Sequence, residues 1–256
     1  MTLSKTAVVF SCGHAKPDFS NERFSWLGKF LYDLKPDYVV DLGDGADMAS
    51  LNSYDTRKPE AIVSQNYEAD INSYNDSQER IRHEFNKAKK KKPKFIGFEG
   101  NHENRIKTAI SHDPRIHGLR YGVSFDHLNC NRWFDAYHEY YNGAPAIANI
   151  DGVDYAHFIG AGNYGRAISG IHHSYGIVQK RYNSATVGHS HKRGMYFKDE
   201  ANAIGAVVGC YKGGDEGWAG QSNGEWWTGI LVKRNIENGM YDPEFISMSR
   251  LEKEYG

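Results

Sequence analysis

Histidine, cysteine, aspartate and asparagine residues recur in five short blocks of this 256-residue sequence. In chain order the blocks are Cys12-Gly13-His14, Gly43-Asp44-Gly45-Ala46-Asp47, Gly100-Asn101-His102-Glu103, His157 and Gly188-His189-Ser190-His191. Their side chains supply the nitrogen, oxygen and sulfur donors that bind divalent metal ions. In the last block two imidazoles lie two residues apart, so an extended strand end would present both on one face. The pattern predicts a metal site assembled from separate segments.

Apolar runs precede the blocks and predict the strands that would position them. Strands are expected at residues 6–11, 38–42, 94–98, 146–150, 153–158 and 185–188, with others near 206–210, 227–233 and 244–248. Helices are expected at residues 21–34, from a capping box at Asp76 into the lysine tract 89–92, and at residues 171–182. This alternation predicts an α/β protein with a mixed sheet. Sites in open α/β sheets form at the carboxyl ends of strands, so we expect the blocks to converge.

Composition narrows the function classes. Lys and Arg number 31 and Asp and Glu 32, and the formal charge of -1 argues against a generally basic nucleic-acid coat. Apolar runs fall far short of the ~20 residues that span a bilayer, and the first residues show no signal pattern. Three cysteines, Cys12, Cys130 and Cys210, do not indicate a disulfide framework. We expect a cytoplasmic protein with no membrane partner.

The order of the blocks resembles the calcineurin-like metallophosphoesterases. That family has Asp-x-His, Gly-Asp-x-x-Asp, Gly-Asn-His-Glu/Asp, one His after a strand, and Gly-His-x-His, and the resemblance covers roughly residues 6–195. It implies a single domain, residues 1–256, folded as a four-layer α/β/β/α sandwich with two mixed β-sheets. Polar insertions at residues 48–75 and 103–140 would form a cap. Residues 50–55 look like those of phage-encoded members, which would place the protein in a host cytoplasm.

The resemblance also implies a binuclear centre of Mn, Zn or Fe. It assigns one ion to Cys12, His14, Asp44 and His191, and the other to Asp44, Asn101, His157 and His189. Two ions ~4 Å apart would share a hydroxide that attacks phosphorus. Asp44 and Asn101 would act in catalysis as ligands, and His102 would assist the leaving group. Glu103 or Asp47 would orient imidazoles.

Two ligand positions stay open at this point. The family has Asp where this chain has Cys12, and a thiolate there would favour zinc or ferrous iron over manganese. An uncoordinated Cys12 would instead weaken the first site, with Asp18 as a substitute. In the fourth block we prefer His157, which follows an apolar strand. His172 and His173 are alternatives, either as ligands or as substrate contacts.

The expected substrate is a phosphate ester. Asn104 and Arg105 follow the third block and are candidate substrate contacts. The basic run at residues 87–94 and aromatic residues at 137–141 and 226–227 would suit a phosphate backbone and bases. We therefore expect a phosphodiester in a nucleic acid or nucleotide, with phosphomonoester or protein phosphatase activity as the alternative. A non-catalytic binding module and an enzyme gated by oxidation of Cys12 are the other classes. No oligomeric state is predicted.

Overall fold

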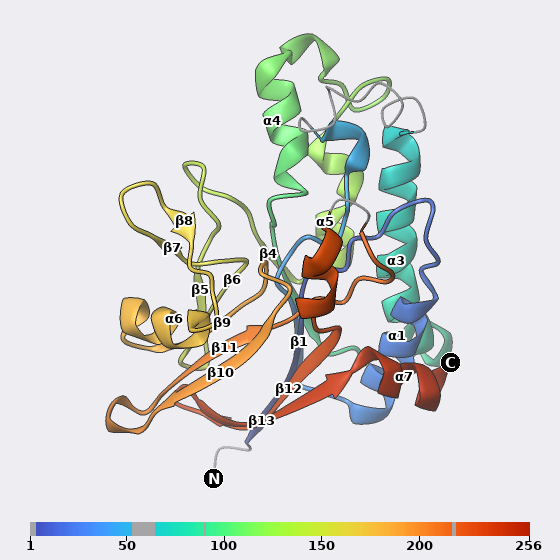
Figure 1. Ribbon diagram of the computed structural model, residues 1–256. Coiled ribbons are helices and arrows are strands. Elements are labelled where there is room, and N and C mark those ends of the chain that lie inside the picture. Colours follow the sequence, from blue (N-terminus) through green and yellow to red (C-terminus); the bar gives the residue numbers. More distant parts are fainter. Residues whose placement is uncertain (1–3, 53–64, 90, 217–218) are drawn as a thin grey trace.

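Two mixed β-sheets pack face to face, with helices on both outer faces (Figure 1). The structure is a computed structural model that describes residues 4–52, 65–89, 91–216 and 219–256. Apolar side chains fill the space between the two sheets and the space between each sheet and its helices. The expected four-layer α/β/β/α sandwich is therefore confirmed.

The first sheet has the strand order β13-β12-β1-β2-β3-β4. Its four parallel strands are β1 (Lys5–Phe10), β2 (Tyr38–Asp41), β3 (Lys94–Phe98) and β4 (Ala136–His138). Two antiparallel strands complete it, β12 (Gly229–Glu237) and β13 (Met240–Ser247). The carboxyl ends of the parallel strands thus meet at one edge, as the sequence predicts.

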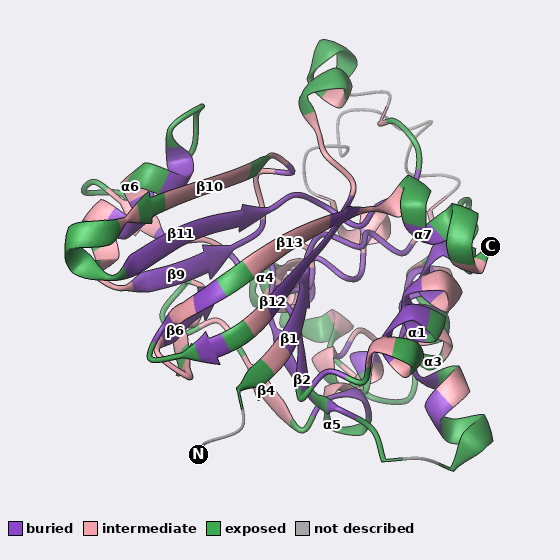
Figure 2. Cartoon of the chain, turned by 90° about the horizontal axis from the view of Figure 1, so that it is seen from below, coloured by how far each residue is buried: buried purple, intermediate pink, exposed green. Residues whose placement is uncertain are grey.

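The second sheet has the order β10-β11-β9-β6-β5. Its strands are β5 (Ala148–Ile150), β6 (Val153–Ala156), β9 (Ser184–Val187), β10 (Arg193–Lys198) and β11 (Ala203–Val208). Strands β6, β9 and β11 run parallel and are wholly buried, and Figure 2 shows β9 and β11 in the buried colour. A short ribbon of β7 (Gly160–Ala161) and β8 (Arg166–Ala167) stands beside this sheet.

Helices cover the outer faces of both sheets. The apolar faces of α1 (Glu22–Leu34) and α3 (Tyr67–Ala88) pack with α7 (Met248–Tyr255) on the first sheet, and α6 (His173–Arg181) packs on the second. The remaining helical segments are η1 (Ala49–Leu51), α4 (Asn104–His112), η3 (Pro114–Ile116), η4 (Phe125–Leu128), α5 (Cys130–Trp133), η5 (Asp199–Ala201) and η6 (Gly220–Glu225). Among the described residues, no helix combines the length and apolarity that crossing a bilayer requires.

Helix α3 corrects the expected helix start at Asp76. Its cap is Asn66, whose side chain accepts a hydrogen bond from the backbone N–H of Ala69. Apolar residues at helical spacing, including Ile71 and Tyr74, extend the buried face back before Asp76, so packing against α1 favours the longer helix. The helix ends at Ala88, so it does not run into the lysine tract 89–92 as expected.

The structure describes the expected insertion at residues 103–140 completely and the one at residues 48–75 only in part. Of residues 48–75, the stretch 53–64 lies outside the described residues. It includes residues 53–55, half of the phage-like segment 50–55, and Lys90 of the basic run is also outside them. Residues 67–75 are helical, which corrects the expected loop. Residues 103–140 contain α4, α5 and the unpredicted strand β4. A cap formed by both segments, a phage origin and a cytoplasmic location stay predictions.

Candidate metal centre

The five blocks of the sequence meet where the carboxyl ends of β1, β2 and β3 face those of β6 and β9. Backbone hydrogen bonds hold the first two blocks together, from Cys12 N to Gly43 O at 2.8 Å and from His14 N to Asp44 O at 2.9 Å. The third block crosses directly over Gly43, where a Cβ atom would lie 2.5 Å from the nitrogen of Gly100. Glycine is therefore required for the loops to approach this closely.

Left-handed backbone conformations concentrate at this point. Five non-glycine residues with positive φ belong to the blocks: Cys12 (52°), His14 (43°), Asp44 (55°), His189 (65°) and His191 (58°). Such conformations are costly for side-chain-bearing residues and persist where surrounding structure determines them, often at functional sites. The backbone is thus locally strained at the residues that carry these donor side chains.

The first donor group surrounds His157, which is completely buried. Its Nε2 lies 3.1 Å from Asp44 Oδ2, 3.0 Å from Asn101 Oδ1 and 3.2 Å from His189 Nδ1. The other ring nitrogen, Nδ1, lies 2.8 Å from the carbonyl oxygen of Leu42, which suits an Nδ1–H donor. With Nδ1 donating to this carbonyl, Nε2 is the ring atom that faces the other donors, and it can bind a metal ion once it gives up its proton. Asp44 and the hydrogen bonds of the ring outweigh burial and raise the pKa of His157.

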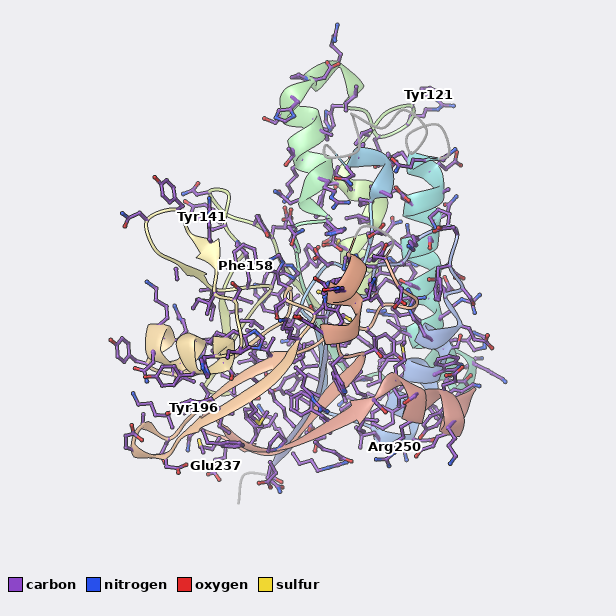
Figure 3. The ribbon with its side chains drawn as sticks, in the orientation of Figure 1. Tyr121, Tyr141, Phe158, Tyr196, Glu237 and Arg250 are labelled. Atoms are coloured by element: carbon purple, nitrogen blue, oxygen red, sulfur yellow. The ribbon has the colours of Figure 1, made fainter. Side chains whose placement is uncertain are left out.

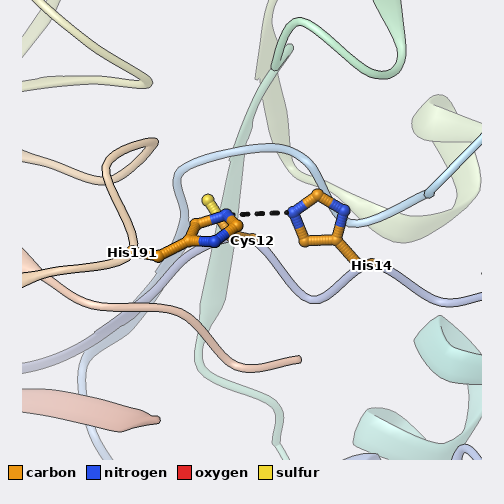
Figure 4. Close-up of side chains that lie close together, drawn as sticks. All are labelled: Cys12, His14 and His191. Carbon is orange, nitrogen blue, oxygen red and sulfur yellow. Dashed lines mark hydrogen bonds between the residues drawn. The ribbon is translucent and has the colours of Figure 1, made fainter. Parts of the chain in front are cut away.

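The second donor group includes His14, which also has a donor atom within 4.8 Å of one of Asp44. The Nε2 atoms of His14 and His191 face each other at 3.2 Å (Figure 4). Cys12 Sγ lies within 4.8 Å of a nitrogen of each ring, and equally of donor atoms of Asp44 and His157. Cys12 therefore borders both donor groups. The sequence left open whether Cys12 is a ligand, and the structure puts its sulfur atom among the donor atoms. Asp18, the possible substitute, lies at the rim of an adjoining pocket.

Burial controls the charge of the ring nitrogens. It lowers the pKa of His189 to about 4 and that of His191 to about 2, and neighbouring imidazoles act in the same direction. Burial and His102 also lower the pKa of His14. These rings are neutral near pH 7, so their lone pairs are free to bind a cation. The donor set fits divalent metal ions for this reason.

The anionic groups complete this picture. Burial opposes ionisation of Asp44, yet His157 and His102 hold its pKa well below the usual value. Burial, together with Asp44, raises the pKa of the Cys12 thiol well above its usual value. A thiol of this kind ionises when a metal ion binds it. Because a buried neutral thiol reacts slowly with oxidants, the structure gives no support to gating by oxidation of Cys12.

Asp47 and Glu103 act on different partners. Asp47 Oδ1 lies 2.9 Å from His14 Nδ1 and 3.3 Å from His102 Nδ1, so it orients both imidazoles. Glu103 contacts backbone instead, and its carboxylate accepts hydrogen bonds from the N–H groups of Asp44, Ala46 and Gly100 at 2.8–2.9 Å. Of the two expected orienting residues, Asp47 contacts imidazoles and Glu103 fixes the loops that carry them.

His102 stands beside the donor groups. Its backbone N–H donates to Asp44 Oδ1 at 2.8 Å, and its ring packs edge-on against His14 at 4.4 Å. Burial lowers the pKa of His102, but the Asp44 and Asp47 carboxylates outweigh burial and raise it. Arg105 Nη2 lies 3.3 Å from His102 Nε2. Of the two candidate substrate contacts, Arg105 lines the adjoining pocket, and Asn104 begins α4 outside it.

The alternative histidines of the fourth block lie elsewhere. His172 caps α6, and His173 is buried at the start of that helix, with Nδ1 3.4 Å from Ser190 Oγ. Their helix covers the outer face of the second sheet. The structure thus places His157, and neither His172 nor His173, beside Asp44.

A pocket of about 670 Å³ opens beside the second donor group. His14, His102 and His191 line one wall, and Lys16, Lys212 and Glu216 belong to its lining as well. Its volume falls in the range of small-molecule sites. None of the last three residues belongs to a motif, and Lys16 lies 200 residues from Glu216, so the sequence offered no signal that they would meet.

The aromatic residues considered for base stacking divide in two. The Trp226 ring lies 4.7 Å from the ring of His191, next to the pocket. Tyr137 packs against Phe134 at 5.3 Å and belongs to the core, whereas Tyr141 is 77% exposed on an outer loop (Figure 3). Trp226 is therefore the aromatic residue of this set with a position suited to a ligand.

Comparisons with known proteins identify similar folds. No protein-family model and no curated protein matches the sequence. A dimetal phosphatase from Danio rerio has a TM-score of 0.47 at 10% identity, with 96% of each chain covered. The phosphoesterase Yfce from E. coli has 0.38 at 9%, covering 95% of this chain and 99% of its own. A Vps29 mutant from Entamoeba histolytica has 0.39 at 7%, covering 94% and 98%. The assignment of the candidate metal centre depends on the distances between its donor atoms and not on these similarities.

Proposed function

We propose that the protein is a metal-dependent phosphoesterase that binds two divalent metal ions on either side of Asp44. One observation carries this proposal: the buried carboxylate of Asp44 lies within 4.8 Å of a donor atom of His157 in one group and of His14 in the other. A carboxylate can ligate two cations at once, and neutral imidazoles add ligands without adding charge. Manganese, zinc and iron are the candidate metals.

The two proposed ligand sets have Asp44 in common. The proposed ligands are Cys12, His14, Asp44 and His191 for one ion, and Asp44, Asn101, His157 and His189 for the other. When bound, such ions polarise phosphoryl oxygens and activate water. The thiolate of Cys12 would shift the metal preference of the site formed by Cys12, His14, Asp44 and His191 toward zinc or ferrous iron.

His102 is the proposed acid. The carboxylates of Asp44 and Asp47 outweigh burial and Arg105 and raise its pKa, which favours a protonated ring that would pass a proton to the leaving oxygen. Asp47 fixes the ring through Nδ1, with the backbone carbonyl of Asp47 2.7 Å away. Arg105, held by the same carbonyl at 2.9 Å, would contact the phosphoryl group.

The proposed substrate is a phosphodiester of nucleotide size. The pocket volume and the nearby Trp226 ring support it. Hydrolysis of a phosphomonoester is the alternative, since the same residues would serve it. A non-catalytic binding module is the second alternative, but a module that only binds has no use for the acid His102.

Metal content and hydrolysis test the proposal together. We expect elemental mass spectrometry to find about two ions per chain in the wild type and about one in Cys12→Ala. Cys210→Ala, another buried cysteine outside the donor groups, is the matched control and keeps both ions. The wild type should cleave an aryl phosphodiester, and Asp44→Ala should not. Absence of metal after soaking with manganese, zinc and iron, or cleavage retained in purified Asp44→Ala, would falsify the proposal.

A further inference from the structure

Two lysines share one carboxylate in the wall of the pocket. Lys16 Nζ lies 3.4 Å from both carboxylate oxygens of Glu216, and Lys212 Nζ lies 3.1 Å from one of them. The Lys212 side chain is 3% exposed and that of Lys16 is 18% exposed. The protein thus keeps two ammonium groups close together in a largely buried place, although like charges repel there.

This group of three residues lies next to the donor groups. Lys212 Nζ is 4.3 Å from the centre of the Trp226 ring, which is 4.7 Å from the centre of the His191 ring. The ammonium group is therefore at most about 9 Å from the His191 ring. Because the same pocket is lined by His14, His102 and His191, a molecule on the metal centre could also reach Lys212.

The charges and hydrogen bonds of the group do not balance. One carboxylate neutralises one of the two ammonium groups and leaves an excess positive charge. Each ammonium has three N–H donors, and among the described residues Glu216 is the acceptor within bonding distance of either one. Donors in a buried place cost free energy unless they find acceptors. An additional anion would satisfy both the charge and the donors.

Other charged residues of the pocket have their own partners. Asp47 orients His14 and His102, and Asp70 accepts a hydrogen bond from the backbone N–H of Ser50 at 2.9 Å. Arg105 donates to the backbone carbonyl of Asp47. Asp18 lies at the exposed rim. Lys16 and Lys212 are therefore the two pocket cations that share a single carboxylate, that of Glu216, among the described residues.

We propose that Lys16 and Lys212 form a second anion subsite, held in place by Glu216. The subsite binds an oxyanion of the substrate other than the reacting phosphoryl group. This inference rests on the proposed phosphoesterase function and narrows its substrate class. The preferred substrates are phosphate esters whose alcohol part carries a further phosphate or carboxylate group.

Calorimetric binding of inert phosphonates to the metal-loaded protein tests the subsite without turnover. The first two ligands are 4-nitrophenylphosphonate and 4-carboxyphenylphosphonate, because nitro and carboxylate groups have the same shape and differ by one charge. A third, 1,4-phenylenediphosphonate, distinguishes a phosphate-selective from a carboxylate-selective subsite. We expect the wild type to bind a two-anion ligand about tenfold or more tightly than the nitro ligand, as one charge-assisted contact allows.

Substitutions of the lysines and of Glu216 should change the preference for two-anion ligands in opposite directions. Lys16→Met and Lys212→Met should reduce the preference for the two-anion ligands toward onefold. Glu216→Gln removes the competing carboxylate and should increase the preference. Lys192→Met is the matched control, because Lys192 follows His191 and pairs with Glu225 but does not line the pocket. This control should keep the wild-type preference.

Each outcome bears on one of the two proposals. Equal binding of all three ligands by the wild type, or a preference unchanged in Lys212→Met, overturns the subsite. If Lys212→Met does not fold by circular dichroism, Lys16→Met and Glu216→Gln decide, since both residues are partly exposed. A lysine-dependent preference in a metal-loaded protein that cleaves no aryl phosphate ester supports the subsite and removes the phosphoesterase proposal.

Discussion

Lys233 offers a sharp test of how the two sheets pack. It lies on β12, is completely buried between the sheets, and its Nζ is 3.0 Å from Tyr155 Oη and 2.6 Å from Thr186 Oγ1. The rings of Tyr155 and Tyr241 flank it at 4.2–4.3 Å. Burial lowers the pKa of Lys233 well below its usual 10.5. The lowered pKa favours a neutral amine in the folded protein, and such an amine can accept a hydrogen bond from one hydroxyl group and donate one to the other.

This burial predicts a specific dependence of stability on pH. Between the folded-state pKa of Lys233 and 10.5, the unfolded chain binds a proton at this residue that the folded protein does not bind. The free energy of unfolding then rises with pH by about 1.4 kcal/mol per unit, and the gain ends above 10.5. Lys233→Met keeps the length of the side chain and removes this contribution.

Urea unfolding of both proteins at pH 8, 9 and 10 measures the effect. Other titrating groups are common to both proteins, so the difference in unfolding free energy isolates Lys233. We expect that difference to change by about 1.4 kcal/mol per pH unit in favour of the wild type as pH rises. Lys87→Met, which replaces an exposed lysine, should give a constant difference. A constant difference for Lys233→Met as well would refute the neutral buried amine.

Two further predictions concern the metal centre. Gly43→Ala should destabilise the protein by about 2 kcal/mol or more and lower its metal content, because φ is 90° and the added Cβ would meet Gly100 N at 2.5 Å; wild-type stability in urea and full metal content would contradict this. His157→Ala should lose about one metal ion per chain by elemental mass spectrometry while His173→Ala keeps both, and the reverse pattern would transfer the fourth ligand position to α6.

Much of the fold is predictable where local pattern and tertiary environment agree. The strand at residues 94–98 is found as β3 at the expected bounds, because an apolar run between Pro93 and a glycine suits a buried parallel strand. The hairpin between β5 and β6 is also confirmed, with Asp151 and Gly152 both at positive φ, as a tight two-residue turn requires.

Other elements depend on partners that the local sequence does not reveal. Helix α3 starts well before Asp76 because its first turns bury apolar residues against neighbouring segments. Strand β10 at residues 193–198 is partly exposed along most of its length, so it lacks the apolar run of a central strand. Pairing with β11 makes it a strand, since the ladder supplies the backbone hydrogen bonds.

The same division applies to the candidate centre. The sequence by itself determined which donor types are present, their order, and their place after strands, because these follow from residue identity and apolar pattern. Only the tertiary structure decided that Cys12 borders both donor groups, and that His157 reaches Asp44 while His173 begins helix α6 on the outer face of the second sheet. It also brought Lys16 and Lys212 to one carboxylate. Such contacts depend on how loops from two sheets approach in space, which no local pattern encodes.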